Sequence, residues 1–157
     1  MNILATQYTL ENRAFEIYVS GCSGNPHCKG CHNPETWDFN KGVKFDKEYL
    51  GKIISKIKGF DGMIDRIFIM GGEPLDQDIL ELMNEMVHHL FVETGKELWL
   101  FTRYNYEECI EKLSIFTEYF DYIKCGRYDD ELITDDNIQF GIKLASSNQK
   151  IYKIKRN

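Results

Sequence analysis

Hydrophobic and polar positions along the chain follow the periods of strands and helices in turn. Residues 15–20, FEIYVS, have the aromatic and β-branched content of a buried strand and run directly into Gly21. A later stretch has the i, i+3, i+4, i+7 spacing of an amphipathic helix, and we expect this helix to begin near Asp46 and to end at Gly59. Its apolar positions are Leu50, Ile53, Ile54 and Ile57.

The same alternation continues downstream. Residues 64–70 predict a second strand, which ends abruptly in Gly-Gly-Glu-Pro at 71–74. A second helical stripe follows, and Gly95 is expected to cap it. Its apolar positions are Ile79, Leu82, Met83, Met86, Val87 and Leu90. The remaining predicted elements are a strand at 97–102, a helix at 106–116 and a strand at 120–125.

Strands that alternate with helices favour parallel βαβ units, so we assign the fold class α/β with a mostly parallel sheet. Three or four such units cannot close an eight-stranded barrel of about 250 residues, and we therefore expect an open, partial barrel. The length of 157 residues predicts a single domain over 1–157. The segments 21–34 and 71–74 follow strand ends, where functional loops of parallel sheets lie. The tail 138–155, with IYKIK, predicts one or two more short strands.

The charge balance excludes some classes of partner. The chain has 19 Lys and Arg against 25 Asp and Glu, a net charge of -6, so no basic field is available to hold nucleic acid. The first residues, MNILATQYTLENR, lack the pattern of a signal peptide, and no stretch approaches the about 18 apolar residues of a membrane span. We expect a cytoplasmic protein that contacts neither nucleic acid nor membrane.

The five cysteines are unevenly spaced. Cys22, Cys28 and Cys31 fall within ten positions, whereas Cys109 and Cys125 lie alone far downstream. In a reducing cytoplasm, clustered cysteines indicate a metal or catalytic site rather than a disulfide framework. We expect Cys109 to be an inert apolar residue, and Cys125 either to be one as well or to face the active cavity.

The spacing C-x5-C-x2-C leaves two kinds of metal site open. A zinc site needs a fourth ligand, which His27 or His32 could supply. An iron–sulfur cube held by three cysteines leaves one iron with an open position, which a cluster needs if it is to bind a substrate. The second arrangement favours catalysis.

A strand that ends in Gly71, Gly72 and Glu73 exposes backbone carbonyls and one carboxylate, groups that suit a cationic amine. The alternative is an ordinary strand-to-helix turn in which Glu73 caps a helix.

Together, these two segments resemble the radical S-adenosylmethionine superfamily, in which a cysteine triad follows the first strand and a Gly-Gly-Glu motif follows the second. More narrowly, VSGC at 19–22, CKGCHNPETW at 28–37 and SSNQK at 146–150 resemble the activating component of anaerobic ribonucleotide reductase. That family usually places three residues between its first two cysteines, and this chain has five. Its Thr-Gly after the third strand is replaced here by Thr102-Arg103.

The resemblance implies a radical-SAM type of partial barrel that binds a 4Fe-4S cluster and S-adenosylmethionine, with no catalytic residues beyond the cluster ligands. The implied iron ligands are Cys22, Cys28 and Cys31. The implied contacts to S-adenosylmethionine are Gly71, Gly72 and Glu73 at the methionyl amine, with Thr102 and Asn148 assigned from loop position alone. An external electron donor such as flavodoxin would reduce the cluster. Cleavage of the sulfonium bond would then give a 5′-deoxyadenosyl radical that takes hydrogen from a glycine of the large reductase subunit.

Two other functions stay open. One is a radical enzyme of the 7-carboxy-7-deazaguanine synthase type that acts on a small molecule, although so short a chain has little material to enclose such a substrate. The other is a non-catalytic metal-binding module that only recognises another protein.

Overall fold

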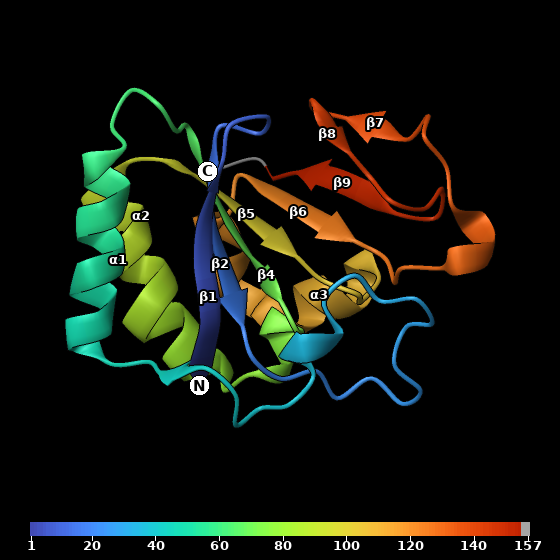
Figure 1. Cartoon of the computed structure of the whole chain (residues 1–157), viewed down its shortest axis with the longest axis horizontal. Coiled ribbons are helices and arrows are strands. Elements are labelled where there is room, and N and C mark those ends of the chain that lie inside the picture. The colour runs from blue at the N-terminus through green and yellow to red at the C-terminus, as the bar shows by residue number, and fades with distance from the viewer. Residues whose placement is uncertain (155–157) are drawn as a thin grey trace.

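A seven-stranded mixed sheet forms the centre of the structure, a computed structural model that describes residues 1–154 (Figure 1). The strand order is β3-β1-β2-β4-β5-β6-β9. The strands are β1 Asn2–Thr9, β2 Ala14–Val19, β3 Val43–Lys44, β4 Arg66–Gly71, β5 Glu97–Phe101, β6 Tyr122–Cys125 and β9 Lys150–Lys153. Strands β2, β4, β5 and β6 are parallel, which confirms the α/β class and the parallel centre. Strands β1, β3 and β9 are antiparallel to their neighbours. The sequence did not predict β1 and β3, whereas β9 falls in the tail where short strands were expected.

Three α-helices in the described residues cover one face of this sheet (Figure 1). They are α1 Lys47–Gly59, α2 His88–Thr94 and α3 Tyr106–Leu113. The side chain of Asp46 caps α1 by accepting a hydrogen bond from the backbone N–H of Tyr49 at 2.8 Å, and Gly95 ends α2 in the left-handed conformation. Both boundaries confirm the sequence prediction, and the four apolar positions predicted for α1 are buried.

Two of the predicted helices differ from the structure in their winding. The stripe before α2 is a π-helix, η3 Glu81–Val87, which keeps its predicted apolar positions buried but is not a regular α-helix. The third predicted helix stops at Leu113 because Ser114 has a φ of 50°, and the chain continues as the 3-10 helix η4 Ser114–Tyr119. The other 3-10 turns are η1 Pro34–Thr36, η2 Pro74–Asp76 and η5 Asp130–Leu132.

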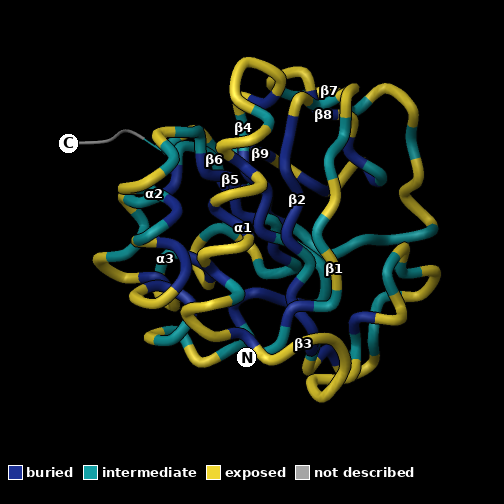
Figure 2. Tube along the Cα trace, turned by 60° about the vertical axis from the view of Figure 1, so that its left-hand side comes forward, coloured by how far each residue is buried: buried dark blue, intermediate teal, exposed yellow. Residues whose placement is uncertain are grey.

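The two faces of the sheet have different covers. On the helix side, aliphatic residues of the strands pack with α1, α2 and α3, and the buried core runs through the middle of the molecule (Figure 2). On the opposite side, Phe68 and Trp99 pack with Ile142, Leu144 and Ile151 from the C-terminal segment. This segment includes the hairpin of β7 Ile138–Gln139 and β8 Ile142–Lys143.

The tail therefore contributes three short strands, β7, β8 and β9, rather than the one or two expected. Lys155, the last residue of the predicted tail segment, lies outside the described residues. Among residues 1–154, no helix is long and apolar enough to span a bilayer.

Candidate active site

The two unusual segments of the sequence meet at the C-terminal edge of the parallel strands. The cysteine segment leaves β2, and the Gly-Gly-Glu-Pro turn leaves its parallel neighbour β4. Main-chain hydrogen bonds join them, because the N–H of Gly72 donates to the carbonyl of Val19 at 2.9 Å and the N–H of Glu73 donates to that of Gly21 at 2.8 Å. The predicted position of both segments at strand ends is thus confirmed.

Close backbone approach explains the glycines of this turn. A Cβ on Gly72 would lie 2.3 Å from the carbonyl oxygen of Gly21 and 2.9 Å from that of Thr36. Gly71 has a φ of +113°, a conformation that side chains rarely allow. These glycines hold the cysteine segment against the turn, and their main chain also lines a cavity of about 160 Å³.

The three clustered thiols are free and half-buried. Cys28 and Cys31 line the cavity, whereas Cys22 is outside its lining and has its Sγ beside Gly24. Burial raises the pKa of Cys22 above its ordinary value. Three free thiols on one loop next to an open cavity fit the donor set of a cluster that is held by three cysteines.

The two histidines that the zinc alternative would use have other contacts, although His32 lines the cavity together with Cys28 and Cys31. His27 Nε2 lies 3.0 Å from the carbonyl oxygen of Cys22, and its ring stacks on Trp37 at a centroid distance of 4.1 Å. The ring of His32 lies 4.7 Å from that of Tyr128. Within residues 1–154, no three His, Cys, Asp or Glu side chains converge as ligands of a single metal ion.

Cys109 and Cys125 lie in the core on the helix side, away from the cavity. Both are buried, and a hydrogen bond between their thiols, followed by burial, raises the pKa of Cys109. Cys125 therefore packs in the core rather than facing the cavity.

Glu73 is almost fully buried, with 1% of its surface exposed. Its Oε1 accepts hydrogen bonds from the N–H of Leu75 at 3.0 Å and from the hydroxyl of Thr102 at 2.7 Å. Its Oε2 accepts one from the N–H of Arg103 at 2.7 Å. Burial raises the pKa of Glu73 to about 7, although these hydrogen bonds act against it. The carboxylate thus caps the turn after β4 and ties it to the loop after β5.

Only some of the residues predicted to contact the cofactor line the cavity. Gly71, Gly72 and Thr102 line it, but Glu73 does not. Asn148 is exposed and also lies outside the lining, and its side chain donates to the carbonyl of Arg127 at 2.8 Å. The neighbouring Gln149 lines the cavity instead. The roles assigned to these residues stay predictions.

A partly exposed polar network beside Cys22 was missed by sequence reasoning. Asp76 Oδ2 accepts from both the N–H and the hydroxyl of Ser23 at 2.7 Å, and its Oδ1 accepts from the hydroxyl of Tyr104 at 2.6 Å. Arg103 Nη2 lies 3.3 Å from Asp76. Burial raises the pKa of Asp76, but these partners outweigh it and leave the value below the ordinary one. Ser23, and with it the start of the cysteine loop, is fixed to the turn after β4.

Met70, Phe101 and Lys124 complete one wall of the cavity and were also missed. They come from β4, β5 and β6, and each points to the side of the sheet opposite the helices. The only sequence signal was the strand alternation itself, which places them on that face.

Comparison with known proteins identifies relatives over most of the chain. The model of the 4Fe-4S single cluster domain family matches residues 12–152. An anaerobic ribonucleoside-triphosphate reductase-activating protein of Haemophilus influenzae is 30% identical over 142 residues, which are 88% of this chain and 86% of that protein. The protein of the same name from Vibrio cholerae is 29% identical over 140 residues, 87% of this chain and 85% of the relative. A pyruvate formate-lyase-activating enzyme of Clostridium pasteurianum is 32% identical over 101 residues, 60% of this chain and 40% of that enzyme.

Proposed function

This chain belongs to the 4Fe-4S single cluster domain family and to the family of anaerobic ribonucleoside-triphosphate reductase-activating proteins, and from that membership we propose that it activates such a reductase. The observation that carries the proposal is the meeting of a three-cysteine loop with the Gly71-Gly72 turn around one cavity at the C-terminal edge of parallel strands. We assign to it a 4Fe-4S cluster and S-adenosylmethionine as cofactors.

The proposed ligands form two groups, one for the cluster and one for S-adenosylmethionine. Cys22, Cys28 and Cys31 hold iron, and the main chain of Gly71 and Gly72 receives the methionyl amine. Once bound, the cluster and S-adenosylmethionine supply a 5′-deoxyadenosyl radical that can take hydrogen from a glycine of the reductase. Reduction needs an external one-electron donor such as flavodoxin.

The other residues assigned to the site, Thr102, Glu73 and Asn148, have fewer groups free to contact the cofactor. Thr102 lines the cavity, but its hydroxyl is donated to Glu73. Glu73 therefore supports the amine site through the turn that it caps, rather than through a carboxylate oxygen that is free. Asn148 remains a candidate for contact with the outer part of the cofactor.

The architecture of the described residues is consistent with an open, partial barrel of the radical-SAM type, and we assign the chain, 1–157, to one domain. Four parallel strands carry helices on one face, and the opposite face is left open at the strand ends. A reducing cytoplasm would keep the three free thiols available as ligands.

A protein substrate suits the shape of the site. A second cavity of about 430 Å³ shares His32, Tyr128 and Ala145 with the first, so the site continues toward the surface instead of closing. A reactive radical must be shielded from water, and a partner loop that enters this opening would serve as substrate and cover together.

The experiment is anaerobic reconstitution of the cluster, followed by mixing with the large reductase subunit, S-adenosylmethionine and a reductant. We expect an electron paramagnetic resonance signal of a glycyl radical whose splitting collapses when the α-carbon of glycine is deuterated. The matched control is Cys28→Ala, which should give no signal.

Efficient conversion of a purified small molecule by this chain alone, without a glycyl signal, would instead support the 7-carboxy-7-deazaguanine synthase type of enzyme. A preparation that holds zinc, contains no iron and leaves S-adenosylmethionine intact would support the non-catalytic module.

A further inference from the structure

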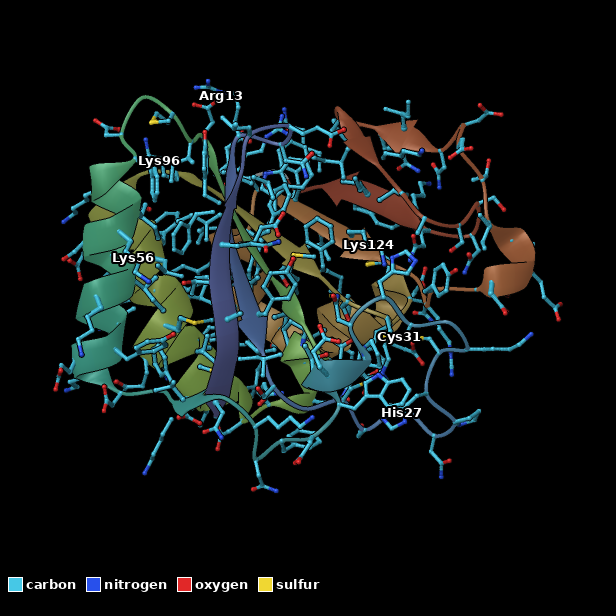
Figure 3. The ribbon with its side chains drawn as sticks, viewed as in Figure 1. Arg13, His27, Cys31, Lys56, Lys96 and Lys124 are labelled. Atoms are coloured by element: carbon cyan, nitrogen blue, oxygen red, sulfur yellow. The ribbon has the colours of Figure 1, made fainter. Side chains whose placement is uncertain are left out.

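Two departures from the family pattern lie side by side in the structure. One is the spacer of five residues between Cys22 and Cys28, and the other is Arg103, which stands where the family has a glycine. Arg103 follows β5 and lines the same cavity as Cys28 and Cys31. His27 and Cys31, labelled in Figure 3, mark the cysteine loop on the side of the molecule away from α1. The additional side chain therefore lies next to the lengthened loop.

The guanidinium of Arg103 is surrounded by carboxylate and hydroxyl groups. Its Nη2 lies 3.3 Å from Asp76 Oδ2 and donates to the hydroxyl of Tyr104 at 3.0 Å. Its Nε lies 4.0 Å from Glu73 Oε2, and only 22% of its side chain is exposed. The guanidinium also lies 4.3 Å from the centroid of the Tyr104 ring. A glycine could form none of these contacts, so they depend on the side chain that this chain has at position 103.

Asp76 connects Arg103 to the cysteine loop. The Asp76 side chain is 4% exposed, and a carboxylate buried to this degree needs a cation and hydrogen-bond donors beside it. Its Oδ2 accepts hydrogen bonds from both the N–H and the hydroxyl of Ser23 at 2.7 Å, and Arg103 supplies the positive charge. Ser23 is the first residue of the spacer and directly follows Cys22. The ion pair therefore fixes the main chain beside the first cysteine.

The other end of the spacer has contacts of its own. Arg127 Nη2 donates to the carbonyl oxygen of Pro26, and His27 Nε2 lies 3.0 Å from the carbonyl oxygen of Cys22. Each fixed end reduces the number of conformations that the longer loop can adopt before a cluster binds. At the first end, this restraint comes from Asp76 and its cation.

We propose that Arg103 is a positioning residue for the cluster, because its ion pair with Asp76 fixes Ser23 and so holds Cys22 in place on the longer loop. The assignment rests on the proposed function, which supplies the cluster, and no motif of the sequence gives Arg103 a role. The charge of Arg103 has a second effect. A cluster accepts an electron less readily beside a negative charge, and Arg103 offsets the charge of Asp76.

The first measurement uses the full-length protein without a cluster. Amide hydrogen exchange at Ser23 is compared between the wild type and Arg103→Met. We expect exchange to be about 10-fold faster in Arg103→Met, because the acceptor of the Ser23 N–H is no longer held by its cation. The matched control is Lys112→Met, which removes a cation of α3 that lies 4.6 Å from the centroid of the Tyr104 ring. This control should leave the exchange at Ser23 unchanged.

The second measurement uses the reconstituted protein under anaerobic conditions. The rate of iron release to a chelator and the midpoint potential of the cluster are measured in the wild type, Arg103→Met and Arg103→Lys. Arg103→Met should release iron about 10-fold faster because Cys22 is less well fixed, and its midpoint potential should be lower because the charge of Asp76 is no longer offset. Arg103→Lys keeps the charge but loses the planar fork, so it should preserve the potential better than the slow release of iron.

A double-mutant cycle tests the route through Asp76. In the Asp76→Asn background, Arg103→Met should change the rate of iron release by less than about threefold, because the ion pair through which Arg103 acts is already lost. An equal effect of Arg103→Met in both backgrounds would contradict this route and overturn the proposal.

Other results separate this role from the proposed function. Unchanged exchange at Ser23, or unchanged iron release, in a folded Arg103→Met protein would overturn the role of Arg103 and leave the proposed function standing. Faster iron release without a change of potential would also overturn it, since a residue that only stabilises the fold would give that result. A wild-type protein that takes up no 4Fe-4S cluster would overturn the proposed function and the role of Arg103 with it.

Discussion

The two faces of the central sheet serve different purposes, although the same strands build both. Toward the helices, the strands present aliphatic side chains that are fully buried. These residues are Ile67 and Ile69 of β4, Leu98 and Leu100 of β5, and Ile123 of β6. Toward the other side, they present aromatic, thioether and charged side chains. These are Phe68 and Met70, Trp99 and Phe101, and Tyr122 and Lys124.

The cover of each face explains the difference. The helix side is closed along the whole strand, so only well-packed apolar residues are stable there. The opposite side is closed by the C-terminal segment only where Phe68 and Trp99 contact Ile142 and Leu144, and farther along the strands it opens into the cavity at Met70 and Phe101. Successive side chains of a strand point to opposite faces, so one residue can stabilise the core while the next lines a binding site.

The largest expected effect comes from the five cysteines, because three lie on the loop beside the cavity and two lie in the helix-side core. Replacing any one of Cys22, Cys28 or Cys31 by Ala should abolish cluster binding if, as proposed, each thiolate ligates iron. The controls Cys109→Ala and Cys125→Ala remove thiols from the helix-side core and should leave the iron content unchanged. The measurement is the iron and sulfide content of the reconstituted protein. A full cluster in Cys28→Ala would show that the assigned ligand set is wrong.

Two neighbouring residues of β4, Ile69 and Met70, point to opposite faces of the sheet and so test the different role of each face. Ile69→Ala removes a side chain that is 0% exposed in the helix-side core, and it should lower the free energy of unfolding by about 2–5 kcal/mol. Met70→Ala, on the cavity side, should lower it by about 1 kcal/mol and weaken binding of S-adenosylmethionine, which Ile69→Ala leaves unchanged. Denaturant titration measures stability, and equilibrium titration measures binding of S-adenosylmethionine. A larger loss of stability in Met70→Ala, or weaker binding in Ile69→Ala, would contradict the different roles of the two faces.

A pH-dependent effect comes from Glu73, which joins the loops after β4 and β5. Burial raises its pKa from 4.5 to about 7 in the folded protein, so between these pH values the native state holds a proton that the unfolded chain has lost. The free energy of unfolding should therefore fall as pH rises from about 4.5 to 7, by up to about 3 kcal/mol. The check is the difference between the stability curves of the wild type and of Glu73→Gln. A difference that does not vary with pH over this interval would contradict the raised pKa.

Local patterns predicted much of the fold. Hydrophobic periodicity placed β2, β4, β5, β6 and α1, and capping residues such as Asp46 and Gly95 set helix ends because they act within a turn of the chain. The antiparallel strands β1 and β3 were missed, and only the presence of short strands in the tail that contains β9 was expected. Strand β1 does not follow a strict alternation of buried and exposed residues, and the pairing of β9 with β6 joins segments that are remote in sequence.

The sequence by itself determined the chemistry of this protein: three thiols on one loop, two glycines at a strand end, and the motifs that relate it to reductase-activating proteins. The tertiary structure decided which groups are available for that chemistry. It turned the carboxylate of Glu73 toward backbone donors of two loops, fixed Ser23 through Asp76, and placed Lys124 in the wall of a cavity that later segments of the chain help to line. The physical reason is that residue types and spacing are local properties, whereas burial and hydrogen-bond partners depend on which distant segments pack together.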